Sequence, residues 1–208
     1  MEQYPGDARP ALNLTAASLA GFFAPTYTPA LPSMPPSLSF LKIGAESEDV
    51  LRSLFQHYLR EMAEWFDVES NPDGSYAYDI AAIWEKGYQA YLAKVGDSVA
   101  GFALVGSADE WLGESSIPRE AHDVHEFFIP REFRRSGIGQ HLATHIWNEY
   151  RGEWLVRLLE ANEPALAFWR TAIAGYARGS QREEAHLAKG RPWVFFRFTS
   201  GGSTMPCS

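Results

Sequence analysis

The sequence predicts an α/β fold with a single domain, in which helices cover both faces of one central mixed β-sheet. Short apolar strand-like runs alternate with segments of helical period along the chain. A length of 208 residues suits one domain, and a hydrophobic content of 46% provides for a sizeable core. The predicted order is strand, two helices, three strands, helix, strand, helix and final strands.

The two ends of the chain differ in composition from its middle. Residues 1–37 are rich in Pro, Ala, Ser and Thr, and the stretch 25–36 excludes regular helix, so we expect a flexible arm. Residues 201–208 contain Gly and Ser with almost nothing to pack, which predicts a flexible tail. The folded domain is therefore expected over residues 38–200.

The N-terminal half is expected to contribute five elements before the central strand. Apolar residues from Val50 to Met62 recur at helical spacing and define the longest of them. A turn signal at residues 71–74 separates the two predicted helices, and the pair Gly96-Asp97 separates the two strands of the hairpin. The predicted elements are a strand at 39–43, helices at 46–66 and 80–85, and a hairpin of strands at 88–95 and 98–105.

The C-terminal half is expected to contribute five more elements. Two helical periods alternate there with apolar or aromatic runs of strand length. The predicted elements are strands at 124–129, 154–159 and 193–198, and helices at 140–150 and 164–174.

Charge and cysteine content exclude several classes of protein. The chain has 18 Lys and Arg against 26 Asp and Glu, which disfavours a generic nucleic-acid binder. Its one cysteine, Cys207, excludes an internal disulfide framework. The apolar run 19–23 is too short to span a bilayer and no basic segment precedes it. We therefore expect a cytoplasmic protein that binds neither nucleic acid nor membrane.

A basic, glycine-containing turn joins the central strand to the next helix. Free N–H groups at a helix start and the helix dipole favour an anion, and Arg131, Arg134 and Arg135 add positive charge. Gly137 and Gly139 let a bulky polyanion approach the backbone. The alternative is an ordinary helix start with solvated arginines. The pattern matches neither the P-loop nor the dinucleotide fingerprint.

Two motifs in order resemble the acetyltransferases of the GNAT superfamily. The form Arg134-x-x-Gly137-x-Gly139 resembles their pyrophosphate-binding motif, and residues 162–169 look like their second cofactor motif. Gly175-Tyr176 stands where the family usually opens its next strand with Gly-Phe. The resemblance covers residues 40–198, is clearest over 124–176, and is nearest to the polyamine and small-amine acetyltransferases.

The resemblance implies acetyl-CoA as cosubstrate and a residue set that holds it. The backbone of Phe128 and Ile129 is expected to bind the pantetheine arm like an added strand. Asn162 is expected to contact the pantetheine or adenine side, although an Asn there also suits a helix N-cap, and the two roles are compatible. The pyrophosphate is expected to lie on backbone amides of a seven-residue run: Arg134, Arg135, Ser136, Gly137, Ile138, Gly139 and Gln140.

Glu126 and His125 are the candidates for accepting a proton from an acceptor amine. A Glu within an apolar strand is costly to bury unless it is paired or solvated, which favours a role in a site over a simple edge position. Strand alternation predicts that His125 points to the opposite face from Glu126. The small-amine relatives have acidic residues at both positions, so His125 departs from their pattern.

Other candidate residues are weaker. His141 and His145 lie one helical turn apart, but no further ligand accompanies them, so no metal site is expected. Trp169 stands where the family often has a Tyr that protonates the leaving thiolate, and an indole N–H is too weak an acid for that task. We therefore expect Trp169 to serve packing, with Tyr176 as an alternative donor.

Three functions remain open at this point. The first is acetyl transfer from acetyl-CoA to a primary amine of a small molecule, by direct attack in a ternary complex. The second uses a protein N-terminus or a lysine side chain as acceptor. The third is a non-catalytic acyl-CoA-binding module. The sequence does not name the acceptor, and it leaves formation of a homodimer open.

Overall fold

The computed structural model describes residues 37–66, 68–109 and 120–201. Apart from Ser37 and Gly201, the expected N-terminal arm and the expected tail, which includes Cys207, lie outside these residues. No helix within the described part of the chain is long and apolar enough to cross a membrane.

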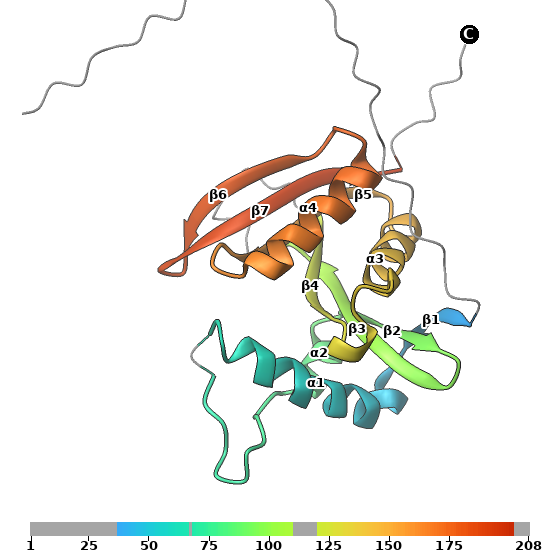
Figure 1. Cartoon of the computed structure of the whole chain (residues 1–208), viewed down its shortest axis with the longest axis vertical. Coiled ribbons are helices and arrows are strands. Elements are labelled where there is room, and N and C mark those ends of the chain that lie inside the picture. Colours follow the sequence, from blue (N-terminus) through green and yellow to red (C-terminus); the bar gives the residue numbers. More distant parts are fainter. Residues whose placement is uncertain (1–36, 67, 110–119, 202–208) are drawn as a thin grey trace, which may run out of the picture.

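One mixed sheet forms the centre of the described structure (Figure 1). Its strand order is β1-β2-β3-β4-β5-β7-β6, and every neighbouring pair is antiparallel except β4 and β5, which are parallel. The strands are β1 (Leu38–Ile43), β2 (Gln89–Val95), β3 (Ser98–Ser107), β4 (His122–Phe128), β5 (Gly152–Leu159), β6 (Arg182–Ala188) and β7 (Arg191–Ser200).

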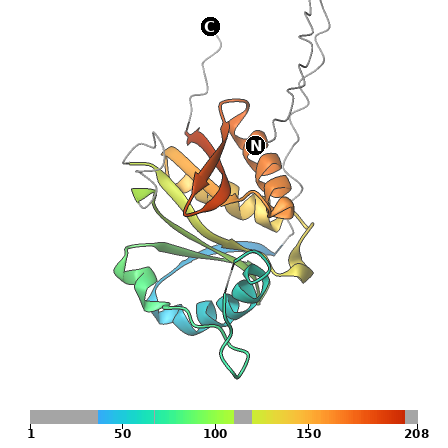
Figure 2. The ribbon, with the colours of Figure 1, turned by 90° about the vertical axis from the view of Figure 1, so that its left-hand side faces the viewer.

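Helices cover both faces of this sheet, as the sequence predicts. Helices α1 (Glu48–Met62) and α2 (Ala81–Glu85) lie on one face, which we call the α1 face (Figure 2). Helices α3 (Ile138–Glu149) and α4 (Glu163–Ala177) lie on the other. Short 3-10 turns at Ala45–Ser47 and Arg131–Phe133 precede α1 and α3. The α/β class is therefore confirmed.

Apolar periodicity explains how each helix docks. In α1 the buried residues recur every three or four positions, so one stripe faces the sheet and packs against Phe102 and Leu104 of β3. On the other face, Trp147 of α3 and Trp169 of α4 enter a second buried cluster with Phe198 of β7. A third cluster, on the α1 face beside β5, contains Leu155, Trp193 and Phe195.

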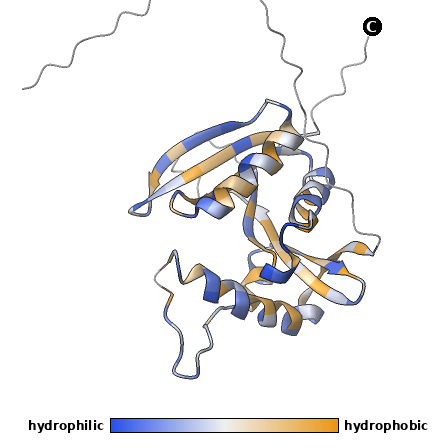
Figure 3. Cartoon of the chain, in the orientation of Figure 1, coloured by the Kyte–Doolittle hydropathy of each residue, from blue (hydrophilic) through white to orange (hydrophobic). Residues whose placement is uncertain are grey.

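One expectation about the C-terminal region is corrected by the structure. Gly175 and Tyr176 do not open a strand, because α4 continues to Ala177 and ends at Arg178, whose φ is 49°. Tyr176 is held in the helix by packing on Trp147 and Phe198. Strand β6 belongs to the final strands that the sequence predicts, but its own bounds cannot be predicted because its residues are mostly polar (Figure 3). It lies at the edge of the sheet, where little apolar surface is required.

The parallel strands β4 and β5 separate soon after they begin. They pair only at His122 with Trp154 and at Asp123 with Leu155, so β4 has no partner on its β5 side from Val124 onward. We call this separation the β4–β5 fork. On the other side of β4 the register shifts: Glu126 pairs with Leu104 and Val124 pairs with Val105 of β3. His125 is therefore the extra residue of a β-bulge.

Candidate active site at the β4–β5 fork

The turn before α3 presents a run of free backbone N–H groups. Arg135 and Gly137 both have positive φ, 61° and 82°, and Gly137 is the N-cap of α3. The first bond into the helix runs from the His141 N–H to the Gly137 carbonyl at 3.0 Å. The amides of residues 135–140 donate to no acceptor among the described residues. Such a concave run of donors at a helix start suits a phosphate group.

Glycine is required at positions 137 and 139 of this turn for two different structural reasons. At Gly137 the backbone is left-handed, a conformation that glycine adopts without steric cost. At Gly139 a Cβ would stand 3.2 Å from Cε2 of Phe168 and 3.4 Å from Cγ1 of Ile129. Gly139 therefore lets α3 approach α4 closely, whether or not a ligand is bound.

The arginines of the turn do not all offer their charge to a ligand. Arg134 donates from Nε to the Ile129 carbonyl at 2.7 Å and from Nη2 to Glu61 of α1 at 2.6 Å. Arg131 lies 3.5 Å from the same glutamate. These two side chains tie the turn to α1, which strand and helix patterns do not predict. Arg135 is exposed and forms no ion pair within the described residues.

The residues expected to hold pantetheine lie at the end of β4. Phe128 and Ile129 are both buried, and the β4 edge leading to them has no strand partner on its β5 side. This open edge suits an extended arm that adds as a strand. The Ile129 carbonyl is already bound by Arg134, so the contact expected at that atom competes with this hydrogen bond.

Asn162 is the N-cap of α4, as one of its two expected roles requires. Its Oδ1 accepts a hydrogen bond from the Ala165 N–H at 3.2 Å. Contact between Asn162 and the cosubstrate stays a prediction.

His125 and Glu126 lie on the same face of β4, so the prediction of opposite faces is wrong. The His125 ring stacks on Tyr88 at 4.4 Å, and the Tyr58 hydroxyl of α1 donates a hydrogen bond to Glu126 Oε2. Phe127 instead packs on Trp169 of α4, on the other face. The bulge at His125 breaks the alternation that the prediction assumed.

The environment of Glu126 makes it a stronger base than an ordinary carboxylate. Burial raises the pKa of Glu126, while the hydrogen bond from Tyr58 and the positive charge of Arg157 oppose the rise. Burial and the Glu126 charge raise the pKa of Tyr58, so its hydroxyl stays a donor. Among the described residues, the one hydrogen bond to the Glu126 carboxylate goes to Oε2, and Oε1 accepts none.

Sequence reasoning missed three members of this cluster: Tyr58, Asp123 and Arg157. Asp123 is 1% exposed, and Arg157 of β5 binds its Oδ2 through Nη2 at 2.7 Å. The sequence signal that could have indicated Asp123 and Arg157 is their position as charged residues next to or within two apolar strand runs. Charged residues are costly to bury alone, so two of them in neighbouring strands suggest a pair. Nothing in the sequence indicates that Tyr58, one of several apolar-face residues of α1, meets Glu126 68 positions later.

The aromatic residues of α4 serve packing. Trp169 is 6% exposed, and its ring lies 4.9 Å from that of Phe127. The Tyr176 hydroxyl donates to the Trp147 carbonyl and to Asn148 Oδ1 of α3. Tyr176 is thus bound to α3.

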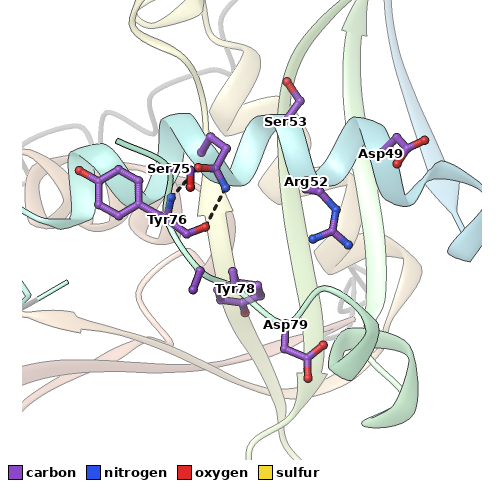
Figure 4. A pocket seen from close by; sticks show the side chains of 9 residues that line it. Asp49, Arg52, Ser53, Ser75, Tyr76, Tyr78 and Asp79 are labelled. Carbon is purple, nitrogen blue, oxygen red and sulfur yellow. Dashed lines mark hydrogen bonds between the residues drawn. The ribbon is translucent and has the colours of Figure 1, made fainter. Parts of the chain in front are cut away.

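The remaining candidates lie away from the fork. His145 stacks on Phe40 and lies 3.7 Å from Glu149, and no cluster of three metal-ligating side chains occurs in the described ranges. A depression of about 830 Å³ lies between α1 and residues 75–79 (Figure 4). Gln56, one of the residues that line it, forms two hydrogen bonds with the backbone of Tyr76. Neither Glu126 nor any residue of the turn before α3 lines it.

Comparison with known proteins agrees with this fold. A family model described as the acetyltransferase (GNAT) family matches residues 52–176, more than half of the chain. The chain therefore belongs to this family and is an acyltransferase. A comparison with curated proteins gave no match.

Solved structures of acetyltransferases share the fold at low sequence identity. A GNAT-family acetyltransferase from Streptococcus agalactiae is 13% identical, with a TM-score of 0.59, over 80% of this chain and 97% of its own. The yncA protein of Salmonella typhimurium, solved with its cofactor acetyl-CoA, is 12% identical, with a TM-score of 0.51, over 83% and 99%. The ribosomal-protein-S18-alanine N-acetyltransferase of Escherichia coli is 10% identical, with a TM-score of 0.52, over 82% and 99%.

Proposed function

We propose that this protein transfers an acetyl group from acetyl-CoA to a primary amine, with Glu126 as the general base. The observation that carries the proposal is the cluster on the α1 face of the fork. There a buried carboxylate with a raised pKa stands on the strand that leads into a turn of backbone amides without described acceptors. A non-catalytic acyl-CoA-binding module would not need such a base.

Acetyl-CoA fits the chain in two places. The free amides of residues 135–140 and the dipole of α3 suit its pyrophosphate. The open edge of β4 suits its pantetheine arm, which would place the thioester beside the fork. The family of the chain and the acetyl-CoA bound to the yncA protein support this donor.

Transfer then proceeds by direct attack within a ternary complex. An acceptor ammonium loses one proton to Glu126, directly or through water, and the free amine attacks the thioester carbonyl carbon. The C–N bond forms, and the C–S bond breaks with its electron pair on sulfur. The nitrogen gives up its second proton to water, from which the departing thiolate can be protonated. The thiolate is a fair leaving group because a simple thiol has a pKa of about 8.5.

A small cationic amine is the acceptor that we favour. The chain carries a formal charge of -8, which attracts cations. The motifs resemble those of small-amine acetyltransferases, and Glu126 adds a carboxylate at the reaction centre itself. Protein N-termini and lysine side chains are the competing acceptors.

The test combines an acceptor panel with a matched pair of variants. Thiol release from acetyl-CoA is measured with spermidine, tyramine, a lysine peptide and a peptide with a free N-terminus. With the best acceptor, Glu126→Gln is expected to keep CoA affinity and to lose roughly 10²–10⁴-fold in kcat, less at high pH where more amine is neutral. Glu85→Gln, the same change at an exposed residue of α2, is the control and should be silent.

Each outcome separates the candidate functions. Turnover of the peptides alone would replace the small amine by a protein acceptor. CoA binding without turnover of any amine would favour the binding module. A Glu126→Gln enzyme with a near-normal rate at neutral pH would remove the base, and a large defect in His125→Gln alone would transfer the role to the histidine.

A further inference from the structure

A buried ion pair bridges the two strands at the point where they separate. Asp123 is the last residue of β4 that pairs with β5, and Arg157 follows two residues after its partner, Leu155. The side chain of Asp123 is 1% exposed and that of Arg157 is 9% exposed. Burying two charges costs several kcal/mol per ion by rough estimate, and apolar residues often replace such pairs without loss of stability. Stability alone therefore does not account for the pair.

Arg157 makes a second contact that restricts His125. Its Nη2 lies 3.0 Å from His125 Nδ1. A guanidinium donates hydrogen bonds and accepts none, so Nδ1 must be the acceptor. The His125 ring is then neutral, with its proton on Nε2, and it is stacked on Tyr88. Asp123 Oδ2, 3.6 Å from Nδ1, holds Arg157 in place for this contact.

This geometry leaves His125 without a nitrogen that can accept a proton. Nδ1 is covered by a cation, and Nε2 already carries hydrogen. The β-bulge puts this ring on the same face as Glu126, whose Oε1 is free of described donors. The groups around the two residues are Tyr58 of α1, Tyr88 before β2, Asp123 of β4 and Arg157 of β5.

We propose that Arg157 is a positioning residue of the acyl transfer: anchored by Asp123 across the fork, it fixes His125 as a neutral hydrogen-bond donor, so that of these two residues Glu126 acts as the base. The inference rests on the proposed role of Glu126. The positive charge of Arg157 also favours the ionised form of Glu126. It lowers the pKa of that carboxyl, whereas burial raises it.

The tautomer of His125 is a direct test that needs no acceptor. Nitrogen-15 NMR of the full chain at pH 8, where an ordinary imidazole is neutral, reports which ring nitrogen carries hydrogen. We expect Nδ1 without hydrogen and Nε2 with it, and His125→Gln assigns the signals. Arg157→Gln should release the ring to a mixture of tautomers, and Arg157→Lys, which keeps a cationic donor, should restore the wild-type form at least in part. Arg170→Gln, which breaks an exposed ion pair with Glu183, is the matched control.

Turnover then connects the tautomer to the reaction. Arg157→Gln should lower kcat by up to about 100-fold while CoA affinity, measured by calorimetry, stays within about twofold. If Arg157→Gln does not fold, Asp123→Asn removes the anchor instead and should loosen the same tautomer.

The inference and the proposed function fail separately. A wild-type His125 with hydrogen on Nδ1, or an even mixture that Arg157→Gln leaves unchanged, would overturn the inference. So would a folded Arg157→Gln enzyme with normal kcat. Full activity in Glu126→Gln would instead overturn the base assignment, whatever tautomer His125 shows.

Discussion

Removing one backbone N–H from the turn before α3 tests whether that turn binds pyrophosphate. Gln140 is the third residue of α3, and its amide lies before the first intrahelical bond, which begins at the His141 N–H. Proline is tolerated in a first turn because it removes a donor that the helix does not use. Gln140→Pro therefore deletes a ligand contact with little effect on the helix. Gln140→Ala, which keeps the amide, is the matched control.

The structure sets the size of the expected effect. A hydrogen bond to a charged group contributes about 1.5–3 kcal/mol, and about 1.4 kcal/mol corresponds to a factor of ten in affinity. Gln140→Pro should thus weaken CoA binding by about 10- to 150-fold, whereas Gln140→Ala should change it by less than about threefold.

Calorimetric titration with CoA measures this difference, and thermal unfolding confirms that both variants are folded. S-acetylpantetheine, which lacks the pyrophosphate, provides a second control, because its KM should be the same in both variants. Equal CoA affinity in Gln140→Pro and Gln140→Ala would refute the assignment of the turn.

Three further predictions concern packing and charge. Trp169→Phe should keep kcat within about threefold and lower the free energy of unfolding by about 1–2 kcal/mol, and a thousandfold loss of turnover in a folded variant would contradict the packing role. Gly106→Ala should cost about 1–3 kcal/mol in urea unfolding, because a Cβ there lies 2.2 Å from Cδ1 of Tyr88. Glu126 has a folded-state pKa raised above 4.5, so its ionisation opposes folding and wild-type stability falls as pH rises through that pKa. Glu126→Gln escapes this loss, so its melting temperature relative to wild type should be higher at pH 8 than at pH 4, and an unchanged difference would contradict the raised pKa.

The order of the elements could be predicted because it depends on local pattern. Apolar runs of strand length and stripes of helical period follow from which side chains must be buried, and these gave α1, α3, α4 and the central strand within a few residues. The glycines and arginines of the turn before α3 marked the phosphate-binding candidate for the same reason: backbone conformation and charge there are local properties. The packing role of Trp169, at a position where the family often has Tyr, could also be predicted, because an indole N–H is too weak an acid to protonate a thiolate.

The assembly of the candidate active site depends on contacts that no local pattern encodes. Strand alternation placed His125 and Glu126 on opposite faces, and a one-residue bulge in the pairing with β3 reversed that. The register of β4 with β5 brought Arg157 onto Asp123, and the docking of α1 brought Tyr58 onto Glu126. Pairing register and helix docking are decided by residues far apart in the chain, so the sequence by itself determined which residue types were present, and only the tertiary structure decided which of them meet.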